Sequence, residues 1–376
     1  MNIILFFTYG ISLKDWREAG ILNKELELYR KLYKDHKVNF TFVTYGSDED
    51  LKILSSKEKI KIVPVYGSRK VLKNKYIKFL DSFLIPFRIK NHIIESDIIK
   101  TNQLYGGWVP IIANILYKKP LLVRTGYDLI TFSILNNKEK IKIKFYELLT
   151  KYSLSKCEIY IVSSETDKKF LELKFNKYKS KLKVRPNWIK NNKENEFSER
   201  HNNKIISVGR LEKQKNYHEL IKSLSNSNFE LIIYGSGSQK SELINLAKKL
   251  GVNMKINKPI ENNLLIKELN KFRLFLSASN FEGNPKAVLE AMSCGCVPIV
   301  KYNENITDII TDNKNGYIFN TEEQILPLIY KLIDSEKDWE YISNATLNSV
   351  LEKNEFSKIV EDEYIDYLNL FSKDNS

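Results

Sequence analysis

The chain has 376 residues, a formal net charge of +14, 43% hydrophobic residues and 12% aromatic residues. This composition excludes a disordered or fibrous protein, and the length exceeds that of one ordinary hydrophobic core, so we expect two globular domains. The three cysteines are too few for a disulfide framework and favour a reducing compartment. No stretch reaches the about 18 apolar residues that a membrane span needs, and "MNIILFF" lacks a basic region before it, so a strand is expected there and not a signal peptide.

The positive charge lies in the first half of the chain. Residues 1–190 contain 37 Lys and Arg against 19 Asp and Glu, whereas residues 191–376 contain 23 against 27. A coding bias toward lysine would spread the excess along the whole chain. We therefore expect the first half to meet something anionic, namely a membrane surface, a lipid phosphate or a nucleic acid.

Apolar runs rich in β-branched and aromatic residues alternate with helical patterns along the first half. Apolar residues at helical spacing predict a helix over 14–35. Such alternation of strands and helices is typical of βαβ units around a parallel sheet. The expected strands are 2–7, 38–45, 59–66, 97–102, 120–125 and 158–164.

A polar run of Asn, Lys and Glu, residues 185–204, interrupts this alternation and is the predicted linker. We predict one Rossmann-like α/β domain over 1–190, a second over 191–354, and a C-terminal helical segment, 355–376, that crosses back to the first domain. Ligands of open α/β sheets bind at the carboxyl ends of the strands, so the expected site is the cleft between the domains. The expected strands of the second domain are 204–210, 229–238, 252–257, 274–279 and 297–302.

The stretch "NFEGNPKAVLEAMSCGCVPIV" in the second half places one carboxylate before a helix and another inside it. Asn284 is the predicted N-cap, with Pro285 at the first helical position. The free N–H groups and positive dipole of that helix end suit a phosphate, and Gly283 lets the backbone approach a ligand. Glu282 then lies at the mouth of the helix, and Glu290 lies where its carboxylate can accept hydrogen bonds from ribose hydroxyls. The alternative is that both carboxylates only stabilise the helix.

This stretch resembles the E-x7-E segment of the retaining GT-B glycosyltransferases of group 1. The resemblance implies an α/β fold of the GT-B type, with two Rossmann-like domains, of which the first binds the acceptor and the second the donor. It also implies transfer of a sugar from a nucleotide diphosphate sugar, UDP- or GDP-linked, without a metal ion or other cofactor. Further segments resemble the family in its own order: "RPNWI" (185–189), "VGRLEKQKN" (208–216), "IIYGSGSQKSEL" (232–243) and "NENITDIITDNKNGYIFN" (303–320), the last with Thr-Asp in place of the usual Pro-Glu.

The chemistry of the reaction agrees with the residues that the resemblance selects. A departing diphosphate needs cations, and a guanidinium fork and an ammonium both suit phosphate. The resemblance implies that Arg210 and Lys215 bind the diphosphate and that Glu282 faces the donor sugar; the alternative is two exposed cations in a lysine-rich chain. The Gly-x-Gly turn lacks the third glycine of a dinucleotide site, which counts against NAD. The residues implied on the donor side are Asn187, Gly235, Gly237, Gly283, Asn284, Lys286 and Glu290.

The first domain departs from the family pattern. Thr125 stands where many relatives have a histidine near the donor sugar, and the family's glycine-rich loop after the first strand is replaced by "TYGISLKDWREAG". Either Arg124 or Asp128 is expected to take over part of the role of this histidine, or the segment around Thr125 only shapes the acceptor pocket. The loop after the first strand is expected to line an acceptor site. The candidates on the acceptor side are Gly10, Ser12, Lys14, Arg124, Thr125 and Asp128.

Three features favour simpler interpretations. The acidic triplet at 48–50 imitates an Asp-x-Asp metal motif but is predicted to cap the helix that follows it. Cys294 and Cys296 have no second pair with which to build a metal site, so no metal is predicted. The run "KEKIKIKF" (138–145) is predicted to be a solvated helix face, with a membrane-docking face as the alternative.

We therefore expect a metal-independent, retaining hexosyltransferase of cell-surface polysaccharide assembly, such as lipopolysaccharide or capsule. Its expected acceptor is a lipid-linked or other glycan precursor, and its expected place is the cytoplasm, peripheral to an anionic inner membrane face. One alternative is a GT-B sugar-nucleotide epimerase or hydrolase. Another alternative is a basic nucleic-acid-binding protein. The sequence shows no aromatic-basic, zinc or helix-turn-helix pattern, so no nucleic-acid partner is expected.

Overall fold

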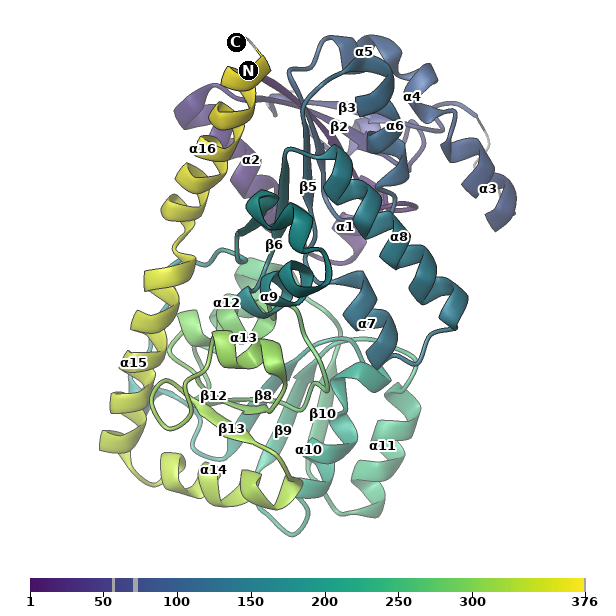
Figure 1. Ribbon diagram of the computed structural model, residues 1–376. Coiled ribbons are helices and arrows are strands. Elements are labelled where there is room, and N and C mark those ends of the chain that lie inside the picture. The colour runs from purple at the N-terminus through teal and green to yellow at the C-terminus, as the bar shows by residue number, and fades with distance from the viewer. Residues whose placement is uncertain (56–57, 70–73, 375–376) are drawn as a thin grey trace. The chain divides into compact units, whose positions relative to one another are not determined.

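The computed structural model describes residues 1–55, 58–69 and 74–374. The chain divides into two compact units, which are Met1–Arg185 with Ile359–Ser376, and Pro186–Lys358. The last two residues of the predicted C-terminal segment lie outside the described residues. Each unit is an α/β body around its own parallel sheet (Figure 1). The predicted fold class of two Rossmann-like parts is confirmed.

The first unit contains, within its described residues, a seven-stranded parallel sheet of order β3-β2-β1-β4-β5-β6-β7. The strand order changes direction between β1 and β4, which defines a switch point at the carboxyl ends of the strands. The six strands predicted in this half are present, and β7 is an additional short strand. The strands are β1 (Asn2–Phe6), β2 (Asn39–Thr44), β3 (Ile60–Pro64), β4 (Ile98–Thr101), β5 (Leu121–Arg124), β6 (Ile159–Val162) and β7 (Leu182–Val184).

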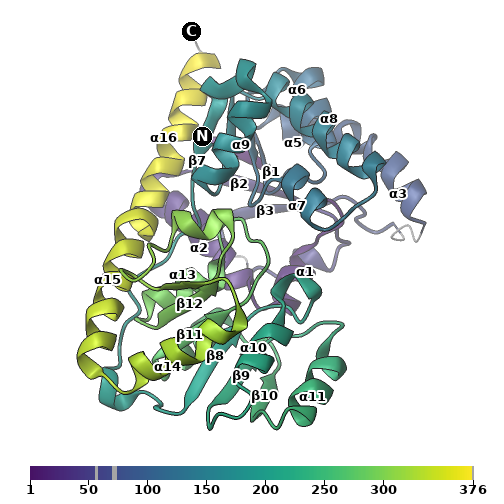
Figure 2. The same ribbon diagram turned by 60° about the horizontal axis from the view of Figure 1, so that its bottom comes forward.

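Helices cover both faces of this sheet. α2 and α16 lie on one side, and α4, α5, α6 and α8 lie on the other (Figures 1 and 2). His36 of α2 stacks on Tyr364 of α16, with ring centroids 3.8 Å apart, which joins the C-terminal helix to this face. The helices are α1 (Leu13–Glu18), α2 (Leu22–His36), α3 (Lys75–Ser82), α4 (Ile85–Arg88), α5 (Lys90–Ile94), α6 (Trp108–Tyr117), α7 (Leu129–Leu135), α8 (Lys140–Lys156), α9 (Glu165–Lys174) and α16 (Phe356–Asp374), with the 3-10 turns η1 (Asp50–Lys52) and η2 (Asn176–Lys181).

Two local predictions in this unit are wrong. The single helix predicted over 14–35 is two helices, because Gly20 adopts a φ of +71° that ends the first one. The acidic triplet does not cap the helix after it, since the N-cap of η1 is Glu49, whose side chain makes no capping bond to the described residues. Asp50 is instead buried and accepts hydrogen bonds from the backbone N–H groups of Leu13 and Lys14, both at 3.2 Å. Its carboxylate therefore stabilises the start of α1.

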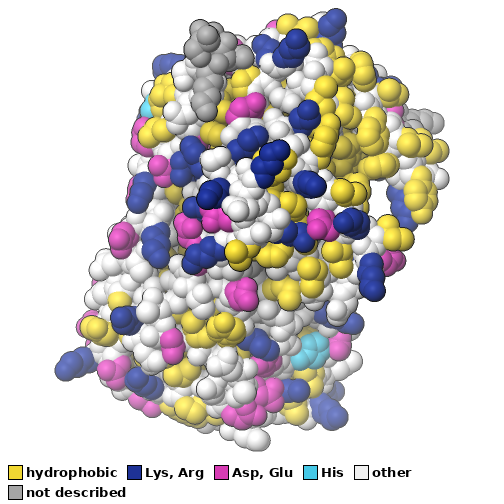
Figure 3. All heavy atoms as spheres, in the orientation of Figure 1, with side chains coloured by type: hydrophobic (Ala, Val, Ile, Leu, Met, Phe, Trp, Pro, Cys, Tyr) yellow, Lys and Arg dark blue, Asp and Glu magenta, His cyan; other side chains and the backbone are white. Residues whose placement is uncertain are grey.

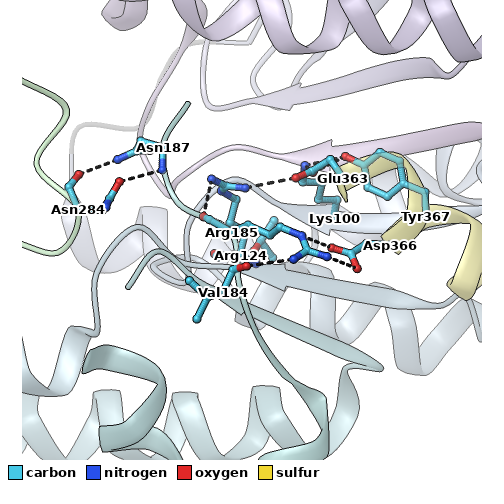
Figure 4. A network of polar contacts seen from close by, with 10 residues as sticks. Lys100, Arg124, Val184, Arg185, Asn187, Asn284, Glu363, Asp366 and Tyr367 are labelled. Atoms are coloured by element: carbon cyan, nitrogen blue, oxygen red, sulfur yellow. Dashed lines mark hydrogen bonds and ion pairs between the residues drawn. The ribbon is translucent and has the colours of Figure 1, made fainter. Parts of the chain in front are cut away.

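Buried ion pairs fasten α16 to the carboxyl side of the sheet in the first unit (Figure 4). The Glu363 carboxylate is paired with the Lys100 ammonium, and it accepts hydrogen bonds from Arg124 at 3.3 Å and from the Tyr367 hydroxyl at 2.5 Å. Burial opposes ionisation, but the charges of Lys100 and Arg124 prevail and lower the pKa of Glu363 to about 2.

A second buried carboxylate of α16 repeats this arrangement one turn further along. Asp366 accepts hydrogen bonds from the Lys183 ammonium at 2.6 Å and from the Arg185 guanidinium at 2.9 and 3.1 Å. Buried carboxylates are costly unless they are paired in this way. The helix is therefore held by specific charge pairs in addition to its apolar contacts.

The second unit, all of whose residues are described, contains a six-stranded parallel sheet of order β10-β9-β8-β11-β12-β13. The five predicted strands are present, and β13 is additional. The strands are β8 (Lys204–Val208), β9 (Glu230–Tyr234), β10 (Met254–Asn257), β11 (Leu274–Ser277), β12 (Val297–Lys301) and β13 (Tyr317–Phe319). The helices and 3-10 turns are η3 (Phe197–Glu199), η4 (Lys213–Lys215), α10 (Tyr217–Ser223), α11 (Lys240–Lys249), α12 (Asn262–Leu269), α13 (Lys286–Ser293), η5 (Glu304–Asp308), η6 (Glu322–Gln324), α14 (Ile325–Ile333) and α15 (Glu336–Asn354).

One hydrophobic cluster packs on each face of this second sheet. Residues of α10, α11 and α14 contribute to one cluster, and residues of α12 and α13 contribute to the other. The strand order changes direction between β8 and β11, so the loops that leave these two strands form the switch point of the unit. Among the helices of the described residues, none has the length and apolar character that a bilayer span requires.

Candidate active site

The loop between β11 and α13 contains the predicted donor-side residues, and its helix starts one residue later than predicted. Pro285 is the N-cap of α13, and a proline side chain has no acceptor with which to cap the first turn. Asn284, the predicted N-cap, uses its side-chain oxygen to accept a hydrogen bond from the Asn187 backbone N–H at 2.8 Å (Figure 4). The Asn187 side chain donates to the Asn284 carbonyl at 2.7 Å. This reciprocal pair fixes the entrance to the helix, and the prediction of an Asn284 cap is wrong because the tertiary contact prevails.

Glu282 and Lys215 form an ion pair at this helix entrance. Their side chains are only 12% and 17% exposed, so the pair is largely withdrawn from water. Lys215 is the last residue of η4, in the loop that leaves β8. Its side chain packs closely on Gly209, because a Cβ added to Gly209 would lie 3.1 Å from the Lys215 Cε atom. The structure thus brings together two of the three predicted catalytic residues, from loops 67 residues apart in the chain.

Arg210 lies on the same loop as Lys215 and is exposed. Its guanidinium donates a hydrogen bond to the Gln214 side-chain oxygen at 3.2 Å. The Gln214 side-chain nitrogen donates in turn to the Phe281 carbonyl at 2.9 Å. Gln214 therefore connects the Arg210 guanidinium to the residue directly before Glu282.

The Glu282 loop is braced from two sides. The Asn280 backbone N–H donates to the Gln214 carbonyl at 3.0 Å, on the β8 side. Asn305, in the 3-10 turn η5 after β12, donates to the Gly283 carbonyl at 3.2 Å. Sequence reasoning did not select Gln214 or Asn305. Both have amide side chains and lie in 3-10 turns, η4 and η5, that follow the carboxyl ends of strands, and this position was the available signal.

Glu290 lies in the second turn of α13 and is buried. Asn262, at the start of α12, donates a hydrogen bond to the Glu290 Oε1 atom at 2.8 Å. A carboxylate oriented by a neighbouring amide is prepared to accept further hydrogen bonds in a fixed direction. Asn262 is another residue that the sequence analysis missed, since its partner is 28 positions away.

Gly235 and Gly237 have a packing role that their sequence pattern alone does not reveal. A Cβ at Gly235 would lie 2.0 Å from the Gly209 carbonyl oxygen, and a Cβ at Gly237 would lie 2.4 Å from the Leu211 carbonyl oxygen. The Leu211 N–H donates to the Ser236 carbonyl at 2.9 Å. Glycine is thus required here for the β8 and β9 loops to touch, and contact with a donor remains a prediction.

The predicted acceptor-side residues lie in the first unit and each has a structural contact there. Ser12 is the N-cap of α1 and exchanges hydrogen bonds with Asp15, and the Lys14 ammonium lies 3.1 Å from the Glu49 carboxylate. Gly10 has a φ of +80°. The Arg124 guanidinium contacts Glu363, as described above.

Thr125 and Asp128 shape the turn between β5 and α7. The Thr125 hydroxyl donates to the Tyr127 carbonyl at 2.6 Å, and Asp128 is the N-cap of α7, where it accepts a hydrogen bond from the Thr131 N–H at 2.6 Å. Burial raises the pKa of Asp128 to about 6. Its Oδ1 atom has no hydrogen-bond partner among the described residues. Within those residues, no group of three or more His, Cys, Asp and Glu side chains is placed to bind a metal ion.

Comparison with known proteins gives glycosyltransferases among the similar proteins. Residues 189–348 match the family model described as "Glycosyl transferases group 1". An uncharacterized glycosyltransferase of Methanocaldococcus jannaschii is 29% identical over 323 residues, which cover 77% of this chain and 72% of that protein. A Campylobacter jejuni enzyme is 25% identical over 307 residues, which cover 79% of this chain and 80% of that protein. That enzyme is named GalNAc-alpha-(1->4)-GalNAc-alpha-(1->3)-diNAcBac-PP-undecaprenol alpha-1,4-N-acetyl-D-galactosaminyltransferase.

The fold has close counterparts among solved structures. The crystal structure of Anabaena HepE in complex with UDP and glucose superimposes with a TM-score of 0.75 at 14% sequence identity, covering 98% of this chain and 100% of that chain. This likeness shows the fold. The resemblance of the chain to the group 1 glycosyltransferases of GT-B fold is therefore confirmed, by the family model over residues 189–348 and by the fold over nearly the whole chain.

Proposed function

We propose that this protein transfers a sugar, with retention of anomeric configuration, from a UDP- or GDP-linked donor to a lipid-linked glycan precursor. The relative from Campylobacter jejuni is named for an undecaprenol-linked acceptor, and the structural relative from Anabaena was crystallised with UDP and glucose. The excess of basic residues in the first half of the chain agrees with an acceptor that has a phosphate group at a membrane.

The observation that carries the proposal is the Lys215–Glu282 ion pair beside the start of α13. In the free protein, Glu282 neutralises Lys215. A bound diphosphate would offer the ammonium a new anionic partner, which leaves the Glu282 carboxylate available to hydroxyl groups of the donor sugar. The first-turn N–H groups of α13 would stabilise the same phosphates, because the helix dipole is positive there.

The proposed reaction breaks the bond between the anomeric carbon and the diphosphate oxygen. The electron pair of that bond goes to the leaving diphosphate, whose new charge is stabilised by Lys215 and Arg210. The acceptor hydroxyl oxygen bonds to the anomeric carbon on the face from which the diphosphate departs, and its proton goes to a leaving phosphate oxygen. These two cations and the helix end supply positive charge without a metal ion.

Glu290 is proposed to bind the ribose of the donor. Its carboxylate is oriented by Asn262 and is fixed in a helix, so it can accept two hydroxyl hydrogens with little loss of conformational entropy. Ribose binding by Glu290 does not select the nucleotide base. A thermal-shift screen with UDP-, GDP- and ADP-sugars would identify the nucleotide.

A transfer assay tests the proposal. Its donor is the nucleotide sugar that raises the melting temperature of the protein in the thermal-shift screen, and its acceptor is a sugar linked to undecaprenyl diphosphate. Lys215→Met should lower kcat/KM about 100-fold or more, the usual loss on removing one group that stabilises developing charge. Lys213→Met is the matched control, because Lys213 is an exposed neighbour in the same 3-10 turn. Activity of the Lys215→Met variant close to that of the control would overturn the proposal, and rapid donor turnover without acceptor would indicate an epimerase or hydrolase.

A further inference from the structure

The first unit exposes a broad apolar surface on the side of its sheet that α4, α6 and α8 cover. Figure 3 shows hydrophobic side chains gathered over these helices, with basic side chains near them. Ile77, Leu80, Phe87, Ile141 and Leu148 are all at least half exposed, and Ile141 is 82% exposed. Single exposed apolar residues are ordinary on a protein surface, but a continuous group of this kind marks an interaction site.

α8 has two apolar sides, and only one of them packs on the protein. Leu149 and Leu154 are buried against the unit. Ile141, Leu148 and Tyr152 are exposed and recur at the spacing of one helix face. At 3.6 residues per turn, these three side chains lie within about 40° of one another. A helix that served only to cover the sheet would have polar residues on this outer face.

The exposed face is continuous across neighbouring helices because side chains of α3 and α8 meet around one tryptophan of α6. The Trp108 indole N–H of α6 donates to the Ser82 hydroxyl at the end of α3 at 2.8 Å. Its ring lies 5.2 Å from that of Phe79 and 6.1 Å from that of Phe145 of α8. α4 also packs against α6. The apolar residues of α3, α4 and α8 therefore belong to one layer.

Lysines flank the exposed stripe of α8 on both sides. The helix contains five lysines and one glutamate. At 3.6 residues per turn, Lys140, Lys144 and Lys151 lie about 60–100° to one side of the stripe, and Lys142 and Lys156 lie about 60–100° to the other. An apolar stripe between two rows of lysines is the arrangement of helices that lie in a membrane interface, where the lysine stems extend toward the headgroups.

We propose that this surface, defined by the exposed residues of α3, α4 and α8, docks on an anionic lipid bilayer. The bilayer satisfies both parts of the surface, since its acyl region receives the apolar stripe and its headgroups neutralise the lysines. A protein partner would need an apolar groove with acidic residues along both edges. The proposal deepens the proposed function, because a lipid-linked acceptor would be presented at the same membrane, but it is tested without catalysis.

The test is sedimentation of the full-length protein with vesicles of phosphatidylglycerol in phosphatidylcholine and with vesicles of pure phosphatidylcholine. Wild-type protein should pellet with the anionic vesicles, and added salt should weaken the binding because it screens the lysines. The Ile141→Asp/Leu148→Asp variant should lose at least about ten-fold in its partition coefficient. Ile244→Asp is the matched control in α11 of the second unit, where the isoleucine is 46% exposed, and it should bind like wild type.

A second pair of variants tests the charge. Lys140→Glu/Lys151→Glu should weaken binding to anionic vesicles and leave binding to neutral vesicles unchanged, whereas Lys249→Glu in α11 should have little effect. Equal binding of the Ile141→Asp/Leu148→Asp variant and the control would overturn the proposal, as would failure of wild type to bind anionic vesicles. If wild type forms dimers and does not bind vesicles, and the Ile141→Asp/Leu148→Asp variant is monomeric, the surface serves self-association instead. Nucleotide-sugar binding, followed by thermal shift, reports separately on the proposed function.

Discussion

The pairing of Lys100 with Glu363 should contribute measurably to the stability of the first unit. Lys100 is 1% exposed and Glu363 is fully buried, so Lys100→Met leaves a carboxylate in the interior with Arg124 at 3.3 Å and the Tyr367 hydroxyl as its remaining partners. The charges of Lys100 and Arg124 lower the pKa of Glu363 to about 2 against the effect of burial, whereas burial lowers the pKa of Lys100, so the two partners' shifts have opposite effects on stability. Breaking a buried ion pair costs about 3–5 kcal/mol in other proteins, and we expect Lys100→Met to fall at the lower end of this range.

Urea unfolding at neutral pH measures this loss. We expect Lys100→Met to lower the free energy of unfolding of the first unit by about 3 kcal/mol. Lys61→Met is the control, because the Lys61–Glu95 pair is exposed and should be worth less than about 1 kcal/mol. The wild-type contribution is present above pH 4.5 and is lost as the pH falls toward 2, since the folded state holds the lower pKa. A loss below about 1 kcal/mol for Lys100→Met would refute this reasoning.

Three further changes should have measurable effects. The pKa of Asp128 is raised to about 6 in the folded protein, so wild type loses stability as the pH rises from 4 to 7, by up to about 3 kcal/mol. Asp128→Asn lacks this titration and should become more stable relative to wild type over the same range, which urea unfolding at the two pH values measures. Gly235→Ala should cost at least about 2 kcal/mol, because its Cβ would meet the Gly209 carbonyl at 2.0 Å, and thermal unfolding tests this. Glu290→Gln should weaken donor binding about ten-fold or more by calorimetry, whereas Asn262→Ala should weaken it less.

The strands of both sheets were predictable because buried parallel strands are short apolar runs with turns at both ends. β7 and β13 escaped prediction because each has only three residues. A lysine within the apolar run of β4 was a signal that sequence reasoning did not use, since a buried lysine needs a buried partner. Its partner, Glu363, lies 263 residues away in a helix. In the sequence, the acidic residues of that helix look like those of an ordinary solvent-exposed helix face.

The resemblance selected residues that the structure brings together at the candidate site, but it did not select the amide residues Gln214 and Asn262. Lys215 and Glu282 have the charges that the chemistry requires, so the resemblance and the chemistry selected them together. Gln214 and Asn262 have no charge and no fixed spacing to the residues they orient, and only the fold brings them into contact. The misplaced cap at Asn284 has the same origin, because a local preference yielded to a hydrogen bond with a residue 97 positions away.

The absence of a histidine at the position of Thr125 bears on how the acceptor hydroxyl loses its proton. The side chains around that position are already engaged: Arg124 with Glu363, Thr125 with the Tyr127 carbonyl, and Asp128 with the first turn of α7. Asp128 has the raised pKa of a general base, but its side chain is buried. If the leaving phosphate takes the proton, Asp128→Asn should keep the transfer rate within a few-fold of wild type. A loss of about 100-fold or more, with donor affinity unchanged, would assign the proton to Asp128 and contradict the phosphate route.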